Sequence, residues 1–300
     1  MKVVVTGSSG LVGSAAVTAL TARGDQVVRL VRRQPRHPGE HRWDPASGQL
    51  DPEALHGAEA IVHLAGAGIG DQRWTPSRKA EIRDSRLRTT ALLAEAVAAA
   101  PTPVPVLGSG SAVGYYGDRG DEVLDEASDP GHDFLARLCH DWEAATGPAS
   151  DAGTRVVLLR TGIVLSARGG ALARQLPLFR LGLGGRLGDG RQWVSWISLR
   201  DEVGAIFHAL DTASLAGPVN ATAPEAVTNA DFTRALAAAV HRPAVLTVPR
   251  VALDLALGRE LTSVALLASQ RVRPGRLLDS GYRFAHPVIG EAMAAALADQ

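Results

Sequence analysis

The sequence has a single cysteine and no net charge, and each of these features excludes a class of protein. Its single cysteine, Cys139, cannot form an internal disulfide or a thiolate zinc cluster. The 31 basic and 31 acidic side chains cancel to a formal net charge of zero, which removes the attraction that nucleic acid or an anionic membrane surface normally requires. We therefore expect a small-molecule ligand, with neither nucleic acid nor a membrane as partner.

Long apolar runs are also missing. The most alanine-rich stretch, residues 91–100, is interrupted by Glu95 and is much shorter than the roughly 20 apolar residues that a membrane-spanning helix needs. Strand-like residues begin at Lys2, where an export signal would place a charged and then an apolar leader. These features predict a cytoplasmic protein.

Short apolar strands alternate with longer helical segments through the first half of the chain. The predicted strands are residues 2–6, 26–31, 60–64, 104–108 and 155–160, and the predicted helices are residues 11–23, 76–99 and 133–146. This order predicts an α/β fold with a doubly wound parallel sheet. After about residue 165 the alternation loosens, with a strand-like run at 193–199 and a helix at 201–210.

A glycine-rich turn joins the first predicted strand to the first predicted helix. Its glycines Gly7, Gly10 and Gly13 are spaced by three residues. Glycine lets a pyrophosphate approach the backbone closely, and the helix N-terminus supplies N–H donors. A tight strand-to-helix turn also favours glycine for its own sake. In this context the turn predicts a Rossmann nucleotide-binding domain, which we place over residues 1–165. The looser alternation that follows predicts a smaller, partly interleaved substrate-side domain over residues 166–300. The candidate cofactor residues of the turn are Gly7, Ser9, Gly10, Leu11, Val12 and Gly13.

The end of the second predicted strand indicates which dinucleotide is preferred. Domains of this kind that bind NAD place a carboxylate there for the ribose 2′-hydroxyl, about 20 residues past the glycines. This chain has Arg32 and Arg33 instead. Two guanidinium groups suit a 2′-phosphate, so the predicted cofactor is NADP(H). The alternative is that both arginines are ordinary solvated residues at a strand end.

Several motifs together resemble the extended short-chain dehydrogenases/reductases. They are Thr6-Gly7-x-x-Gly10-x-x-Gly13, Val62-His63-Leu64-Ala65-Gly66, and Ser111 ahead of Tyr115-Tyr116-Gly117. Further runs resemble one atypical branch of that superfamily: Arg160-Thr161-Gly162-Ile163-Val164-Leu165 and Gln270-Arg271-Val272-Arg273-Pro274. That branch is the uncharacterised epimerase family, sometimes labelled cell-division-inhibitor-like, with a C-terminal module of unknown function, here at about residues 249–296.

The resemblance implies NADP(H) binding and assigns further residues to it. Leu64, Ala65 and Gly66 are expected behind the adenosine ribose and the pyrophosphate, and Val164 near the nicotinamide. Glu81 and Arg86 are expected to line the cofactor cleft, with an exposed helical ion pair as the alternative. The helices at 76–99 and 133–146 correspond to those that many relatives use for a four-helix interface, which predicts a homodimer.

The catalytic pair of the extended family is missing. Those enzymes use a tyrosine as general acid or base and a lysine four residues later. In the register set by Glu143, the lysine position holds Cys139 and the tyrosine position holds Leu135. Ser111, with Tyr115 or Tyr116, is the nearest candidate set, and a packing role for either tyrosine is the alternative. The acidic loop at residues 118–129 lacks a metal-ligand spacing, so no metal is expected.

Residues 188–193 resemble the substrate-domain segment of nucleotide-sugar epimerases. The arginine that grips the sugar nucleotide in those enzymes is Val194 here, so Arg186 or Arg191 would have to replace it, and Trp193 is a candidate for lining the pocket. Two functions stay open. One is an NADP(H)-dependent oxidoreductase or epimerase-like enzyme acting on a small carbonyl or sugar-like compound; the other is a catalytically silent NADP(H)-binding sensor or scaffold.

Overall fold

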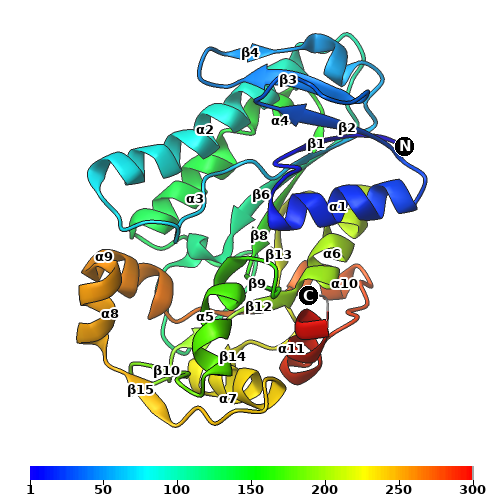
Figure 1. The fold of residues 1–300 in the computed structure, drawn as a ribbon. Coiled ribbons are helices and arrows are strands. Elements are labelled where there is room, and N and C mark those ends of the chain that lie inside the picture. Colours follow the sequence, from blue (N-terminus) through cyan, green and yellow to red (C-terminus); the bar gives the residue numbers. More distant parts are fainter. Residues whose placement is uncertain (299–300) are drawn as a thin grey trace.

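The computed structural model describes residues 1–298 and has an eight-stranded sheet at its centre (Figure 1). The strands lie in the order β13, β8, β6, β5, β1, β2, β3, β4, and only β4 runs antiparallel to its neighbour. This arrangement confirms the predicted doubly wound α/β fold. The strands are β1 (Lys2–Thr6), β2 (Gln26–Val31), β3 (Glu40–Asp44), β4 (Gln49–Leu50), β5 (Ala60–His63), β6 (Val106–Ala112), β8 (Arg155–Thr161) and β13 (Gly217–Ala221).

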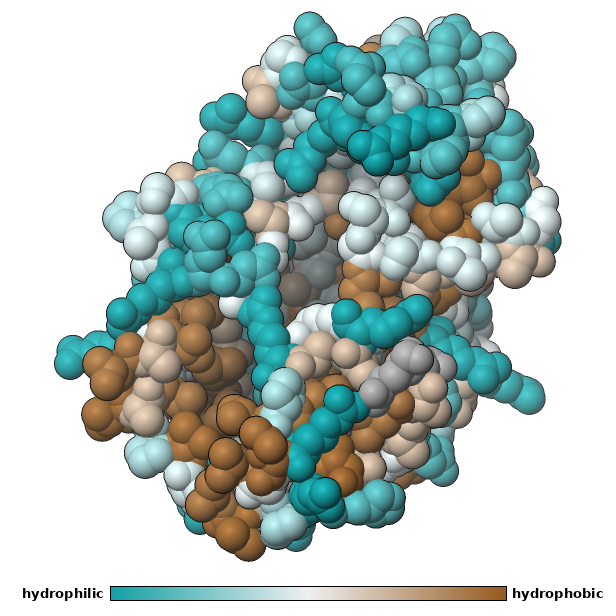
Figure 2. Space-filling model, viewed as in Figure 1, coloured by the Kyte–Doolittle hydropathy of each residue, from teal (hydrophilic) through white to brown (hydrophobic). Residues whose placement is uncertain are grey.

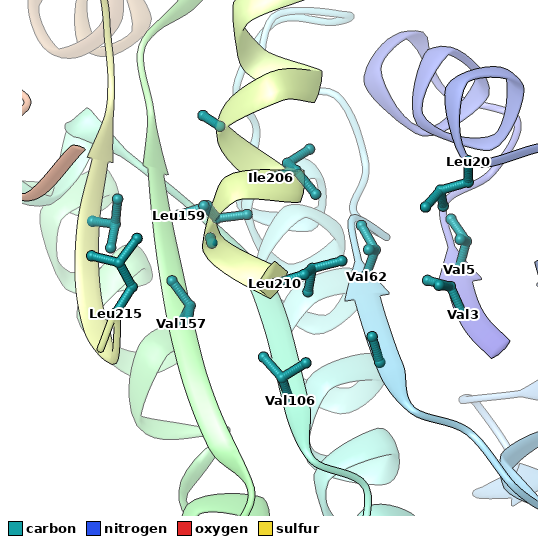
Figure 3. Packing of buried hydrophobic residues seen from close by; sticks show 14 of the residues in the cluster. Val3, Val5, Leu20, Val62, Val106, Val157, Leu159, Ile206, Leu210 and Leu215 are labelled. Carbon is teal, nitrogen blue, oxygen red and sulfur yellow. The ribbon is translucent and has the colours of Figure 1, made fainter. Parts of the chain in front are cut away.

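Helices cover both faces of the sheet. On one face, α1 (Leu11–Ala22) and α6 (Leu199–Asp211) bury Leu20, Ile206 and Leu210 against strand residues such as Val62 and Leu159 (Figure 3). The other face packs against α2 (Pro76–Ala98) and α4 (Gly147–Asp151), while α3 (Phe134–Ala144) lies against α2 and β6. Because both faces are buried, the central strands are continuous apolar runs.

Capping side chains mark the starts of several helices. The hydroxyl of Thr75 accepts the N–H of Arg78 at the start of α2, where Pro76 occupies the first turn. The Asp133 carboxylate caps α3, and the Ser198 hydroxyl caps α6. Each cap satisfies an N–H group that would otherwise lack a partner.

The order of the strands creates a switch point beside β1. The chain winds from β1 outward through β2 and β3, then returns to β5 on the other side of β1 and continues through β6, β8 and β13. Ligands bind in open α/β sheets at such a point, outside the carboxyl ends of the strands. The turn after β1 and the loop after β5 meet there.

Apart from β8, β13 and α6, much of the second half of the chain forms a smaller layer below the sheet edge (Figure 1). A separate core there includes Leu172, Phe179, Trp196, Phe232 and Met293. Its helices are α5 (Gly170–Arg180), α7 (Asn229–Ala239), α8 (Arg250–Leu257), α9 (Arg259–Leu261), α10 (Gly275–Asp279) and α11 (Ile289–Ala298). Short strands pair as β9 (Ile163–Leu165) with β12 (Trp196–Ser198), β10 (Gly185–Leu187) with β15 (Leu246–Val248), β11 (Trp193–Val194) with β14 (Val227–Thr228), and β7 (Val123–Leu124) with β16 (Arg271–Val272). Single turns are η1 (Pro52–Leu55), η2 (Val113–Tyr116) and the π-helical η3 (Thr262–Leu266).

The predicted elements of the first half match strands β1, β2, β5, β6 and β8 and helices α1, α2 and α3. The run 193–199, predicted as one strand, is two strands separated at Ser195, whose hydroxyl donates to Gln270 and whose carbonyl accepts from Ile163. The division near residue 165 stays a prediction; β13 returns to the central sheet from beyond it. Within residues 1–298, no helix has both the length and the apolar character needed to cross a membrane.

We expect the core of the sheet to be intolerant of truncation. Leu159 in β8 is 0% exposed and packs in the cluster beneath α6, so Leu159→Ala should lower the free energy of unfolding by about 2–5 kcal/mol in urea titrations. Leu255 on α8, 79% exposed, is the matched control, and its replacement by alanine should change stability by less than about 0.5 kcal/mol. Equal losses in the two variants would contradict this packing.

Candidate functional site

The turn between β1 and α1 needs glycine at two positions for packing alone. Gly7 has a φ of +66°, and a Cβ on it would lie 2.6 Å from the Leu64 carbonyl oxygen. A Cβ on Gly13 would lie 2.1 Å from the carbonyl oxygen of Gly7. Gly10 is different: it is exposed, extended, and would bring a Cβ no closer than 3.3 Å to that oxygen. Gly10 therefore leaves open space in front of the start of α1, which has no side-chain cap.

The other predicted residues of this turn lie around that opening. Ser9 is exposed, and Leu11, the first residue of α1, packs near Gly169 and Gly170. Val12 packs against the core beneath the helix. The side chain of Val12 therefore holds α1 in place rather than facing the opening.

A chain of hydrogen bonds holds the loop after β5 against this turn. Thr6 Oγ1 accepts N–H groups from Leu64 (3.1 Å) and Ala65 (3.3 Å) and is bonded to the His63 ring (2.7 Å). The other ring nitrogen of His63 meets Thr90 at 2.9 Å. Complete burial lowers the pKa of His63 to about 4, so its ring is neutral and structural. Leu64, Ala65 and Gly66 thus lie across the switch point from Gly7.

The two arginines after β2 have different surroundings. Arg33 forms two hydrogen bonds to the Glu40 carboxylate, 2.8 and 2.7 Å long, and these lower the pKa of Glu40 to about 2. The Glu40 side chain is 1% exposed. Arg32 is exposed and has no hydrogen bond or ion pair within the described residues. Sequence reasoning missed Glu40 because it is carried by the next strand, β3, and not by the end of β2.

Glu81 and Arg86 are separated by the structure. The Glu81 side chain is 59% exposed and pairs with Arg78 at 2.7 Å, so the alternative of a Glu81–Arg86 ion pair does not form. Arg86 points inward: it donates to the carbonyl oxygens of Ala67 (2.9 Å) and Ile82 (3.1 Å) and lies over the Trp142 ring. Burial lowers the pKa of Arg86, which has no carboxylate partner in the described part of the chain.

A cavity of about 180 Å³ lies where the ends of β6 and β8 meet the C-terminal segment. The face shown in Figure 2 is hollowed near its middle, between the part that carries the sheet and the part that carries α5 and α8. The walls of the cavity are mostly apolar, and its polar lining groups come from Arg86, Thr161, Ser195 and Gln270. The remaining lining includes Ile69, Ala112, Val113, Gly114, Leu135, Leu138, Cys139, Trp142, Ile163, Trp193, Val194, Val264, Ala265, Leu266 and Ala268.

Leu135 and Cys139, which occupy the positions of the missing tyrosine and lysine, both line this cavity. Cys139 is 3% exposed, and burial raises the pKa of its thiol to about 12. The thiol is therefore neutral at physiological pH, and its sulfur supplies neither the positive charge of a lysine nor a ready proton.

The predicted catalytic residues Ser111, Tyr115 and Tyr116 gather around Arg160, a residue that sequence reasoning did not single out for a role. Ser111 Oγ donates to Glu143 at 2.6 Å, and Arg160 holds the same carboxylate through two hydrogen bonds of 2.8 and 2.9 Å. The Tyr115 ring lies 3.4 Å from the Arg160 guanidinium. These residues form one cluster in which Tyr115 and Glu143 are half-buried and the others buried, but none of their side chains is part of the cavity lining.

Tyr116 is the most enclosed member of the cluster. It is 0% exposed, donates its hydroxyl hydrogen to Asn220 at 2.7 Å, and accepts a hydrogen bond from Arg160 at 3.1 Å. Burial raises the pKa of Tyr116 to about 12. This arrangement favours the packing role for Tyr116, and the catalytic roles of Ser111 and Tyr115 stay predictions.

The structure separates the predicted substrate residues. Trp193 and Val194 line the cavity, and the Trp193 indole donates to Asp121 at 2.9 Å. Arg186 is exposed and donates to Thr247 at 3.1 Å, while Arg191 is exposed on the preceding loop. Neither arginine reaches the cavity wall. Val164 in β9 is half-buried and follows the lining residue Ile163.

The acidic loop forms contacts of other kinds. Glu122 pairs with Arg119 at 2.7 Å, and Glu126 accepts the backbone N–H groups of Asn220 and Arg276. Across residues 1–298, no three His, Cys, Asp or Glu side chains lie close enough to hold a metal ion.

Comparison with known proteins places this architecture in a family. The model of the NAD dependent epimerase/dehydratase family matches residues 3–221, and that of a domain of unknown function, DUF1731, matches residues 248–296. The chain belongs to this epimerase family. An epimerase family protein of Mycobacterium tuberculosis, MT2273, is 50% identical over 97% of this chain and 96% of its own length. The human epimerase family protein SDR39U1 is 38% identical, with 98% of each chain covered.

Solved structures agree with this assignment. The crystal structure of human SDR39U1 (isoform 2) with NADPH superposes with a TM-score of 0.91 at 36% identity, covering 100% of both chains. A nucleoside-diphosphate sugar epimerase from Corynebacterium glutamicum superposes with a TM-score of 0.81 at 42% identity, covering 100% of this chain and 59% of its own. The family predicted from the sequence motifs is therefore confirmed.

Gly10 and Gly13 differ in the space around them, and this difference can be tested by measuring stability. Gly13→Ala places a Cβ 2.1 Å from the carbonyl oxygen of Gly7, so the turn has to move and the midpoint of urea unfolding should fall markedly. Gly10→Ala, with its ordinary extended backbone, should cost less than about 1 kcal/mol. A Gly13→Ala variant as stable as Gly10→Ala would show that the turn is looser than this packing implies.

Proposed function

We propose that this protein is an NADP(H)-dependent oxidoreductase or epimerase-like enzyme that acts on a small carbonyl or sugar-like compound. The main support is the full-length similarity to human SDR39U1, whose crystal structure contains NADPH. The open space at Gly10, the uncapped start of α1 and the unpartnered Arg32 are features that a phosphorylated dinucleotide requires. When bound, NADPH would supply the hydride.

Each part of the cofactor has candidate residues. Gly10 and the first N–H groups of α1 would take the pyrophosphate, and Leu64, Ala65 and Gly66 would lie behind the adenosine ribose. Arg32 would pair with the 2′-phosphate, while Arg33, already engaged by Glu40, would border it. Towards the nicotinamide the candidates are Arg86 and Val164. Glu81, at the surface, contributes by orienting Arg78.

The cavity favours a small substrate with an apolar body. Its volume of about 180 Å³ is small for a ligand pocket, and Arg186 and Arg191 lie outside its lining. A nucleotide sugar would need cationic groups for its diphosphate, which the cavity wall does not offer apart from Arg86. We therefore favour a small carbonyl compound over the sugar nucleotide that the description of the Corynebacterium structure suggests.

A second candidate function is an NADP(H)-binding sensor or scaffold without turnover. It is favoured by Leu135 and the neutral Cys139 thiol, which stand at the positions of the missing catalytic tyrosine and lysine. Stopped-flow absorbance of protein-bound NADPH, mixed with a panel of small ketones and aldehydes, separates the two functions. Hydride transfer to any member of the panel supports the enzyme, and tight NADPH binding without transfer supports the sensor. The homodimer and the cytoplasmic location stay predictions.

Cofactor preference should depend on Arg32. Because a charge-assisted hydrogen bond contributes about 1.5–3 kcal/mol, Arg32→Ala should weaken NADPH binding by roughly 10- to 100-fold and leave NADH binding nearly unchanged, as measured by fluorescence titration. Arg88→Ala, an exposed arginine on α2 whose side chain is 61% accessible, is the control. Equal affinities of the unaltered protein for NADPH and NADH would refute the preference.

The opening at Gly10 can be tested with the same titration. Gly10→Val fills the space before α1 with a branched side chain while keeping an allowed extended backbone. We expect NADPH binding to be lost and the circular dichroism spectrum to be retained. A folded Gly10→Val variant that binds NADPH like the parent would show that the turn has a structural role only.

A further inference from the structure

The molecule contains a buried carboxyl group that the proposed cofactor site does not use. Glu202, in the first turn of α6, is 1% exposed. Its Oε1 accepts a hydrogen bond from the Thr161 hydroxyl at 2.8 Å, and its Oε2 has no hydrogen-bond partner within the described residues. A carboxylate so enclosed loses its hydration without full compensation.

No positive charge near Glu202 compensates for this burial. The elements packed against α6 are chiefly α1, β6, β8, β9 and β12, and of these only β8 carries titratable side chains, Arg155 and Arg160. Arg155 donates to carbonyl groups at the opposite end of α6, and Arg160 is paired with Glu143.

The titratable side chains of the adjoining C-terminal loop and of α6 itself likewise form no hydrogen bond or ion pair with Glu202 in the described part of the chain. Tyr282 and His286 face Asp201, the neighbour of Glu202, and Arg200 is exposed. Burial therefore raises the pKa of Glu202 to about 7, with the Thr161 hydrogen bond as the one opposing effect.

Thr161 connects this acid to the cavity. It is the last residue of β8, pairs in register with Ala112 at the end of β6, and lines the cavity together with Ile163 and Ala112. Leu135 and Cys139, at the positions of the missing catalytic pair, line the same cavity. Thr161 thus belongs to the cavity lining and is hydrogen-bonded to a carboxyl group whose pKa burial raises to about 7.

Two of the other candidate proton donors are engaged elsewhere. Ser111 donates its hydroxyl hydrogen to Glu143, and Tyr116 donates its own to Asn220. Neither side chain is among the cavity-lining groups. The Cys139 thiol lines the cavity but holds its proton up to a pKa of about 12. Thr161 is therefore the lining hydroxyl that has an acid behind it.

We propose that Thr161 and Glu202 form the acid–base relay of this cavity, in place of the missing tyrosine and lysine; the inference rests on the proposed NADP(H)-dependent function. When bound, NADPH would supply a hydride to the substrate carbonyl carbon; the C=O π pair would move onto oxygen, and that oxygen would take the hydroxyl proton of Thr161. When Glu202 is protonated, the 2.8 Å hydrogen bond would run from its carboxyl O–H to Thr161 Oγ1, which leaves the Thr161 hydrogen free for the substrate. After the transfer Thr161 would regain a proton from Glu202, which is left as a carboxylate until water reprotonates it. The products are the alcohol and NADP⁺, and oxidation runs the same steps in reverse.

In this scheme Thr161 is the catalytic residue, and Glu202 is a positioning residue that acts through it. A purely structural Glu202 would cap the Thr161 hydroxyl without affecting how any rate depends on pH. The pH profile and the carboxyl spectrum therefore distinguish the two roles. The variants are Glu202→Gln and Thr161→Val, with Thr222→Val as matched control, since Thr222 is a 0% exposed threonine outside the cavity lining, with an unpartnered hydroxyl.

The first measurement is infrared titration of each protein with bound NADPH. The parent and Thr222→Val should show the C=O stretch of a protonated carboxyl that disappears between about pH 6 and pH 8. Thr161→Val should shift this band, because its hydrogen bond is removed, and Glu202→Gln should abolish it. Absence of a band titrating in this range, or a band that Thr161→Val leaves unmoved, overturns the proposal even if Glu202→Gln does not fold.

The second measurement is NADPH-dependent reduction of 9,10-phenanthrenequinone, an apolar dicarbonyl probe. The parent rate should fall about tenfold per pH unit above pH 7, and Thr161→Ser should keep that profile. Glu202→Gln should be about 100-fold slower with a flat profile, while its NADPH affinity stays within about threefold of the parent. A parent-like slope in Glu202→Gln overturns the relay.

The two proposals fail in distinguishable ways. A parent that does not bind NADPH, or binds it without reducing any carbonyl probe, contradicts the proposed enzyme and with it the relay. A parent that reduces the quinone but shows no titrating carboxyl at Glu202 leaves the enzyme standing and removes the relay alone.

Discussion

The close approach of Gly7 to its neighbours is the constraint on which the rest of the molecule depends. Residues 3–6 of β1 are 0% exposed at the middle of the sheet. The chain has to reverse into α1 within a few residues while the loop after β5 passes beside it. Leu64 lies against Gly7 on one side, and Gly13 lies against it on the other. Thr6 secures the same junction through hydrogen bonds to the β5 loop. This packing fixes the opening at Gly10 and the position of the loop after β5 beside it.

The sequence predicts most of the sheet because buried parallel strands are short, continuous apolar runs. β3 was missed since Glu40–Asp44 is mostly polar and buries little except Trp43 and Glu40. The residues around the cavity were predicted less well for a related reason. A buried charged residue is indistinguishable in sequence from a solvated one, and the partners that identify Glu40, Glu143, Arg160 and Glu202 lie between 7 and 41 residues away. Only the family resemblance supplied Arg86 and Val164.

The two carboxyl groups beside the end of β8 show how their surroundings assign their roles. Glu143 receives two hydrogen bonds from Arg160 and one from Ser111, so its polar atoms are matched inside the cluster. Glu202 receives a single hydroxyl hydrogen bond and faces no cation in the described chain. The first arrangement gives a rigid, fully bonded cluster. The second is costly to ionise, and such an imbalance is characteristic of groups that transfer protons.

The C-terminal segment forms one wall of the cavity, and buried polar side chains bind it to the sheet. Asn220 at the end of β13 donates to the Arg273 carbonyl at 3.0 Å, and the Glu126 carboxylate accepts N–H groups from both Asn220 and Arg276. Since Val264, Leu266 and Gln270 form one wall of the cavity, that wall is positioned by contacts with β13 and the acidic loop. The acidic loop therefore serves as an anchor for the cavity wall.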